Sequence, residues 1–223
     1  MLFERELFGE DHDIFRDSVR KFMEREVVPH HERWEKEGQV DRELWSKAGE
    51  AGLLCPNLPE EYGGPGADFV YSAIVIEELA YVGASGPGFP LHSDIVAPYI
   101  LHYGSEDLKR KWLPKFVSGE AVGAIAMTEP GTGSDLQAVK TTAQADGNHL
   151  VVNGSKTFIT NGQHADVVIV VAKTDPAAGA KGTSLVLVET DREGFSRGRN
   201  LEKIGLKAQD TSELFFDDVR VPA

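Results

Sequence analysis

The spacing of apolar residues changes once along this chain, near Gly119, and this change limits the folds that the chain can adopt. Before Gly119, apolar residues recur every three or four positions, the period of an amphipathic α-helix. After it they alternate or form short β-branched runs between turn residues, which is typical of β-strands. The sequence therefore predicts an all-α domain over residues 1–120 and a β-domain over residues 121–223.

Five helical segments are expected in the first half. They span 13–28, 41–51, 68–82, 93–103 and 105–117. Asp11 or Asp13 is expected to cap the first helix and Pro29 to stop it, with a polar connection to the second. The third segment is apolar on nearly every side, which indicates a helix buried on several faces. Its acidic pair, Glu77 and Glu78, is interpreted as helix surface or an interdomain contact.

Short strands are expected in the second half. They span 122–127, 139–145, 150–153, 156–160, 167–173, 184–189 and 213–221. Two sequences carry hairpin-turn signals, Asp146-Gly147-Asn148 and Asn153-Gly154. Because no helical pattern lies between the runs, the β-domain is expected to be an antiparallel sandwich or barrel.

Composition excludes several classes of function. The chain has 23 Lys and Arg residues against 36 Asp and Glu residues, a formal net charge of −13, which argues against nucleic acid as the main partner. No apolar run approaches the roughly 20 residues that a membrane span requires. The single cysteine, Cys55, cannot form an internal disulfide, fits a reduced cytosolic setting and is interpreted as a small packed hydrophobe. The scattered histidines give no metal-ligand spacing, so no metal is expected.

The densest cluster of unusual residues is the run 126–135, Ala-Met-Thr-Glu-Pro-Gly-Thr-Gly-Ser-Asp. It leaves a predicted strand and becomes a glycine-rich loop. Glycines let a backbone approach a ligand closely, and hydroxyls such as those of Thr128 and Ser134 can donate or accept hydrogen bonds. The loop has neither the Gly-Lys-Ser/Thr ending of a P-loop nor the third glycine of a dinucleotide fingerprint. These residues alone leave a ligand-binding loop and a plain tight turn equally open.

Residues 126–138 resemble the signature of the acyl-CoA dehydrogenases, which runs through Glu-Pro-Gly to Gly-Ser-Asp. Further matches follow in family order over nearly the whole chain, at 153–162, 205–211 and 216–222. Residues 85–93 and the run Ala-Gln-Asp-Thr look like the long-chain subgroup. The resemblance implies a third, C-terminal helical bundle that would begin about where this chain stops, so the chain is expected to be truncated.

The resemblance also implies FAD as cofactor, with its ring against the β-domain. The implied FAD contacts are Ile125, Ala126, Met127, Thr128, Gly133, Ser134, Phe158, Ile159 and Thr160. Phe158 stands where many members have Trp, and ordinary core packing is the alternative for it. The implied acyl-CoA contacts are Ser134, Ala180, Lys181, Pro90, Leu91 and Asp94. A surface loop remains the alternative for Ala180 and Lys181, and helix packing for Pro90, Leu91 and Asp94.

The implied reaction is α,β-dehydrogenation of an acyl-CoA thioester to trans-2-enoyl-CoA, in β-oxidation of medium to long fatty acids. The family's base is a Glu from the third domain, so no catalytic residue is expected in this chain, and the 223 residues alone are expected to be inactive. By the same resemblance Glu129 belongs to the flavin-binding turn.

Electron-transfer flavoprotein is the implied acceptor, and a homodimer or homotetramer the implied assembly. The expected location is the bacterial cytoplasm or, in a eukaryote, the mitochondrial matrix. The alternatives are an acyl-CoA oxidase or flavin monooxygenase of the same fold, and a flavin-free binding protein.

Overall fold

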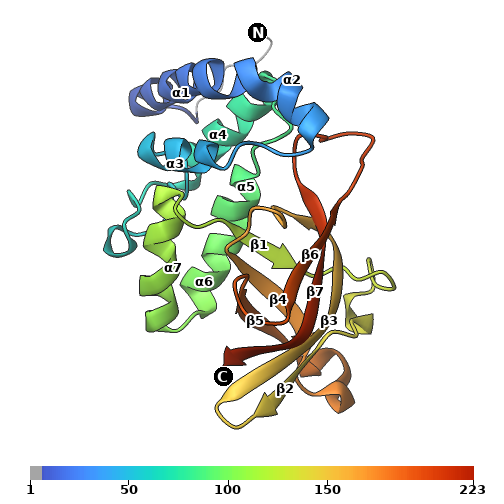
Figure 1. The fold of residues 1–223 in the computed structure, drawn as a ribbon. Helices are drawn as coiled ribbons and strands as arrows, with labels where there is room; N and C mark the ends of the chain where they lie inside the picture. Colours follow the sequence, from blue (N-terminus) through green and yellow to red (C-terminus); the bar gives the residue numbers. More distant parts are fainter. Residues whose placement is uncertain (1–6) are drawn as a thin grey trace. The chain divides into compact units, whose positions relative to one another are not determined.

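The computed structural model describes residues 7–223, which divide into two compact units. One unit runs to Ala121 and also includes Lys203–Gln209, and the other comprises Val122–Glu202 and Asp210–Ala223. The first unit holds the α-helices and the second a curled, mixed β-sheet (Figure 1). The predicted fold class, a helical region followed by a β-rich region, is confirmed.

The helical unit is built from short and medium helices. They are α1 (Glu10–Phe22), η1 (Met23–Val27), α2 (Val28–Glu37), α3 (Glu43–Glu50), η2 (Glu60–Tyr62), α4 (Phe69–Tyr81), α5 (Phe89–Leu91), η3 (His92–Val96), α6 (Ala97–Tyr103) and α7 (Glu106–Ser118). Helices α3, α4 and α7 confirm three of the predicted segments, and η3 with α6 makes the fourth, 93–103, helical throughout. At α7 the hydroxyl of Ser105 accepts a hydrogen bond from the backbone N–H of Leu108, so this helix begins at a side-chain cap.

The first predicted helix differs from the structure at both ends. Its N-cap is Gly9, not Asp11 or Asp13, and the Gly9 N–H donates to Nδ1 of His12 at 3.0 Å. Pro29 does not stop the helix, because the π-helical turn η1 leads directly into α2. Proline lacks an N–H and fits the first turn of a helix, where that group has no partner. The expected polar connection is therefore helical.

Glu78 corrects the interpretation of α4, because its side chain is only 2% exposed. Its carboxylate accepts hydrogen bonds from Arg16 at 3.1 Å and from Arg20 at 3.0 Å, both on α1. Burial acts to raise the pKa of Glu78, but the two guanidinium groups outweigh it and hold that pKa below its usual value. Glu78 therefore joins α4 to α1 inside the helical unit.

The second unit is one seven-stranded sheet. Its strands are β1 (Gly123–Ala126), β2 (Thr142–Asp146), β3 (His149–Thr160), β4 (Val167–Lys173), β5 (Thr183–Glu189), β6 (Phe195–Asn200) and β7 (Thr211–Pro222). They follow the order β1-β4-β2-β3-β7-β6, with β5 also paired to β4. Strand β4 is buried at every residue, as expected for its apolar run. The predicted hairpin turn at 146–148 joins β2 to β3.

Three features of the sheet differ from expectation. It is not wholly antiparallel, because β4 runs parallel to β1 and meets β2 in parallel at one residue pair. Strand β6 was not among the predicted strands. Asn153-Gly154 forms no turn, so the predicted strands 150–153 and 156–160 are one strand, β3, with an irregular register at this point. A Cβ on Gly154 would lie 2.4 Å from Oγ1 of Thr141, so the close packing here requires glycine.

Candidate functional site

The glycine-rich run leaves the end of β1 as a closed turn. Glu129 and Thr132 exchange two backbone hydrogen bonds of 3.0 Å. The hydroxyl of Thr132 then donates to the carbonyl of Ala138 at 3.0 Å. Gly133 and Ser134 lie between these fixed points and are exposed. The predicted glycine-rich segment is therefore an ordered turn with an accessible tip.

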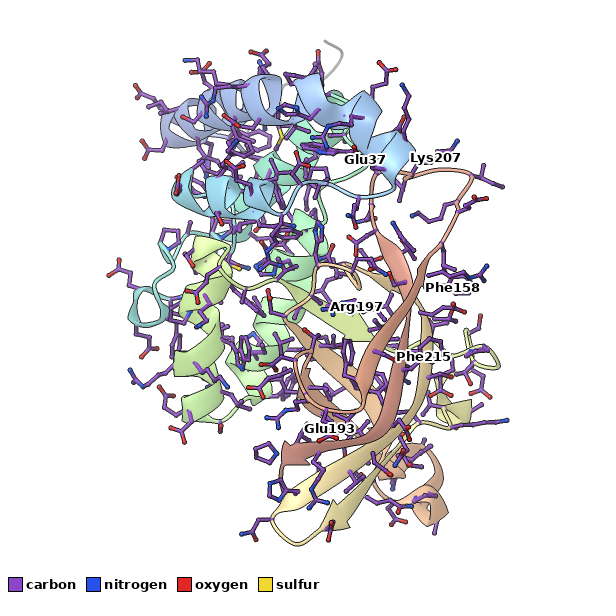
Figure 2. The ribbon with its side chains drawn as sticks, in the orientation of Figure 1. Glu37, Phe158, Glu193, Arg197, Lys207 and Phe215 are labelled. Carbon is purple, nitrogen blue, oxygen red and sulfur yellow. The ribbon has the colours of Figure 1, made fainter. Side chains whose placement is uncertain are left out.

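Strand β3 runs beside the start of this turn. The backbone N–H of Thr157 donates to the carbonyl of Thr128 at 2.9 Å, which brings Phe158 close to the loop. Phe158 has a positive φ of 59° and is 66% exposed (Figure 2). Core packing is therefore excluded for this side chain. A bulky residue in the left-handed region is strained, and such strain concentrates at functional sites.

Hydroxyl groups on the glycine-rich turn and on β3 next to Phe158 are available to a ligand. Within residues 7–223, the side chains of Thr128, Ser134 and Thr160 make no hydrogen bond to another residue. The side chains of Ile125, Ala126 and Ile159 are buried, so these three residues could reach a ligand only through their backbone groups. An exposed aromatic face beside free hydroxyls fits a flat heteroaromatic ring with a polar edge.

A buried ion pair lies under the turn. Lys156 on β3 is 1% exposed, and its ammonium donates to Oε1 of Glu129 and to the carbonyl of Met127, both at 2.9 Å. The Glu129 carboxylate also accepts the backbone N–H groups of Lys140, at 2.7 Å, and Thr141, at 2.9 Å. This carboxylate is fully engaged and poorly suited to take a proton from a substrate.

The pKa values of the pair follow from burial and from these hydrogen bonds. Burial acts to raise the pKa of Glu129, but bonds from Thr141, Lys140 and Lys156 outweigh it and hold that pKa below its usual value. For Lys156 burial is the larger influence and lowers the pKa, although Glu129 opposes it. Lys156 is not among the predicted site residues. It pairs with buried Leu214 in the β3–β7 register, a neighbour that only the folded sheet reveals, so no sequence signal points to Lys156.

The other predicted contacts lie elsewhere. Ala180 and Lys181 are exposed on η5 (Pro176–Gly182) of the β unit. Pro90, Leu91 and Asp94 belong to the helical unit and are half-buried. Burial raises the pKa of the Asp94 carboxyl, which has the Ser72 hydroxyl as its neighbour. Among the predicted site residues within 7–223, those around Thr128 and Phe158 are brought together inside the β unit.

Two family models match the chain in succession. The model of the acyl-CoA dehydrogenase N-terminal domain matches residues 9–120, and that of the middle domain matches residues 124–219. The chain belongs to the acyl-CoA dehydrogenase family. The mitochondrial long-chain specific acyl-CoA dehydrogenase of Sus scrofa is 59% identical over 221 residues, which cover 98% of this chain and 51% of that protein.

Solved acyl-CoA dehydrogenase structures share the fold. That of the enzyme from Geobacillus kaustophilus superimposes with a TM-score of 0.96 at 56% identity, covering 99% of this chain and 58% of that one. The acyl-CoA dehydrogenase of Bacillus anthracis complexed with FAD gives a TM-score of 0.89 at 38% identity, covering 99% of this chain and 38% of that one. The chain spans about half the length of the curated relatives that it matches.

No helix within residues 7–223 combines the length and the apolar character that crossing a membrane requires.

Proposed function

We propose that this chain supplies the N-terminal helical domain (1–120) and the middle β-domain (121–223) of an FAD-dependent acyl-CoA dehydrogenase. The reaction is α,β-dehydrogenation of a medium- or long-chain acyl-CoA to trans-2-enoyl-CoA, in fatty-acid β-oxidation. The observation that carries the proposal is the hydrogen bond from Thr157 to Thr128, which sets free hydroxyls beside the exposed ring of Phe158. The 59% identity to a long-chain specific enzyme supports the substrate class.

The residues around the turn fit the flavin. Thr128 and Ser134 offer hydroxyls to its polar atoms, and Phe158 offers an aromatic face to its ring. Thr160 would offer a further hydroxyl, and backbone groups would come from the remaining contacts, namely Ile125, Ala126, Met127, Gly133 and Ile159. When bound, FAD supplies the hydride acceptor for the reaction, and the protein supplies binding and orientation.

The proposed acyl-CoA contacts form two sets of residues. Ser134, Ala180 and Lys181 are proposed to lie near the CoA portion, where the Lys181 ammonium can pair with phosphate. Pro90, Leu91 and Asp94 are proposed to set the length of the acyl chain. The exposure of Lys181 and the half-burial of Leu91 and Asp94 agree with these roles.

The base that removes the Cα proton is proposed to come from outside residues 1–223. Glu129 is the carboxylate nearest the proposed ring contacts in sequence, and its oxygens are already bound by Lys156 and two backbone N–H groups. The isolated 223-residue chain is accordingly proposed to be inactive. The proposed electron acceptor is an electron-transfer flavoprotein, and the proposed assembly is a homodimer or homotetramer. Its proposed location is the bacterial cytoplasm or the mitochondrial matrix, the latter favoured by the mitochondrial relatives.

The test uses protein expressed from the complete reading frame that contains this chain. Oxidation of acyl-CoA substrates of increasing length is measured with electron-transfer flavoprotein and, separately, with air as acceptor. The proposal predicts turnover with the flavoprotein, a preference for medium or long chains and slow reoxidation by air. Fast reoxidation by air would indicate an oxidase or monooxygenase instead. Purified protein with neither flavin nor turnover would favour the binding protein.

A further inference from the structure

Lys156 makes both of its side-chain hydrogen bonds to the segment that carries Thr128. Its ammonium binds the carbonyl of Met127 on one side of Thr128 and the carboxylate of Glu129 on the other, each at 2.9 Å. We infer that Lys156 is a positioning residue that fixes the Thr128 hydroxyl and its neighbouring peptide groups for the flavin. This inference rests on the proposed function.

Three contacts join this segment to two adjacent residues of β3. Besides the two bonds of Lys156, the N–H of Thr157 binds the carbonyl of Thr128 at 2.9 Å. Each residue from Met127 to Glu129 is therefore attached once to the Lys156–Thr157 pair. Such an arrangement leaves the segment little freedom to rotate, because strand β3 is itself bonded to β2 and β7.

Glu129 extends the same network to the far end of the glycine-rich loop. Its two carboxylate oxygens accept the N–H groups of Lys140 and Thr141, directly before β2. The carboxylate thus closes the loop at its base. Lys156 in turn supplies the positive charge without which a buried carboxylate is costly.

The tip of the loop has no comparable support from packing. A Cβ built on Gly131 or on Gly133 would meet no atom within 4 Å. Ser134 and its neighbours are exposed as well. The geometry at the loop tip therefore depends on the base of the loop, where Lys156 and Glu129 lie. Loss of this pair should change the position of Ser134 as well as that of Thr128.

A purely stabilising role for the pair makes a different prediction, and the helical unit offers a matched control. Glu78 is likewise a buried carboxylate held by cations, Arg16 and Arg20, and it belongs to the helical unit, whereas the loop belongs to the β unit. Substitution E78Q should lower thermal stability as E129Q does. Only the variants at Lys156 and Glu129 should change flavin binding.

The experiment measures the dissociation constant of FAD, the visible circular dichroism of bound FAD and thermal unfolding for the product of the complete reading frame. The variants are K156M, K156R, E129Q, the double variant K156M/E129Q and the control E78Q. We expect K156M and E129Q to raise the dissociation constant on the order of tenfold, equivalent to about 1.4 kcal/mol. The double variant should match either single one, because both changes break the same network. K156R should recover part of the affinity, since it keeps the charge.

Two results would overturn the inference while leaving the proposed function intact. One is an unchanged FAD dissociation constant and dichroism in K156M, and the other is an equal loss of affinity in E78Q. If K156M does not fold, E129Q and K156R decide the question by the same two measurements. A wild-type protein that binds no FAD would refute the proposed function and, with it, this inference.

Discussion

The ammonium of Lys156 and the carboxylate of Glu129 meet at 2.9 Å inside the β unit, under the turn that carries Thr128. Both side chains are almost completely removed from solvent. Buried ion pairs contribute little net stability compared with apolar residues of similar volume. Removing one partner nevertheless lowers stability strongly, because the other charge is left buried without a partner. Their value here is that they hold a particular geometry at the proposed flavin site.

Phe158 should show a conflict between stability and ligand binding. Replacing it by glycine relieves the left-handed backbone, which costs a bulky residue about 1–2 kcal/mol. Phe215 is the control, because it is an exposed residue of β7 whose φ is not positive. We expect F158G to lose less stability in urea unfolding than F215G, by roughly 1 kcal/mol. F158G should nevertheless bind FAD more weakly than wild type. Equal losses of stability in the two variants would contradict the strain at Phe158.

Gly154 should tolerate no side chain. In G154A the new Cβ would lie 2.8 Å from the backbone Cα of Thr141, so the strand must shift, and we expect a loss of about 3 kcal/mol in the free energy of unfolding. G147A is the control, because Gly147 also has a positive φ, 61°, but nothing within 4 Å. It should lose only about 1 kcal/mol. Similar losses in both variants would show that the contact with Thr141 is unimportant.

Asp94 should destabilise the folded chain at neutral pH. Burial raises the pKa of its carboxyl above the usual 3.8, so the folded state binds this proton more tightly than the unfolded state. Stability is therefore lost as pH rises through the folded pKa. We expect D94N to be more stable than wild type at neutral pH, with the difference closing as pH falls toward 3.8. Chemical denaturation of both proteins between pH 3.8 and neutral pH measures this difference in stability. A D94N variant that is less stable than wild type at neutral pH would contradict the prediction.

Cys55 should be chemically inert in the folded chain. Its thiol is fully buried, and burial raises its pKa to about 12. Because the thiolate is the reactive form, a disulfide reagent such as DTNB should label Cys55 only after unfolding in urea. Labelling of the folded protein at the rate of an exposed thiol would contradict this burial.

Some elements could be predicted closely from the sequence. Strand β4 has the predicted bounds 167–173, because a short β-branched run favours a buried strand. Helix α7 has Ser105 as its N-cap, and a serine in this position is a local sequence signal. The glycine-rich run 126–135 was identifiable as the candidate site, because its hydroxyls and glycines are unusual in any strand or helix.

Other elements depend on contacts that a local pattern does not carry. Proline commonly ends a helix, so Pro29 predicts an end, but the π turn η1 leads into α2 with Pro29 in the first turn of that helix. Strand β6, Phe-Ser-Arg-Gly-Arg-Asn, lacks alternating apolar residues and exists through its pairing with β7. Lysine is seldom fully buried, so Lys156 gave no sign of lying inside. Its burial becomes understandable only when folding brings Glu129 beside it.

If this chain contributes flavin-binding residues to an acyl-CoA dehydrogenase, as proposed, the flavin of the complete protein should respond to substrate. The most direct measurement is the visible spectrum of the purified product of the complete reading frame, under anaerobic conditions, before and after palmitoyl-CoA is added. We expect a flavin spectrum that palmitoyl-CoA bleaches and that free coenzyme A leaves unchanged. A flavin spectrum unaffected by any acyl-CoA, or no flavin spectrum at all, would contradict it.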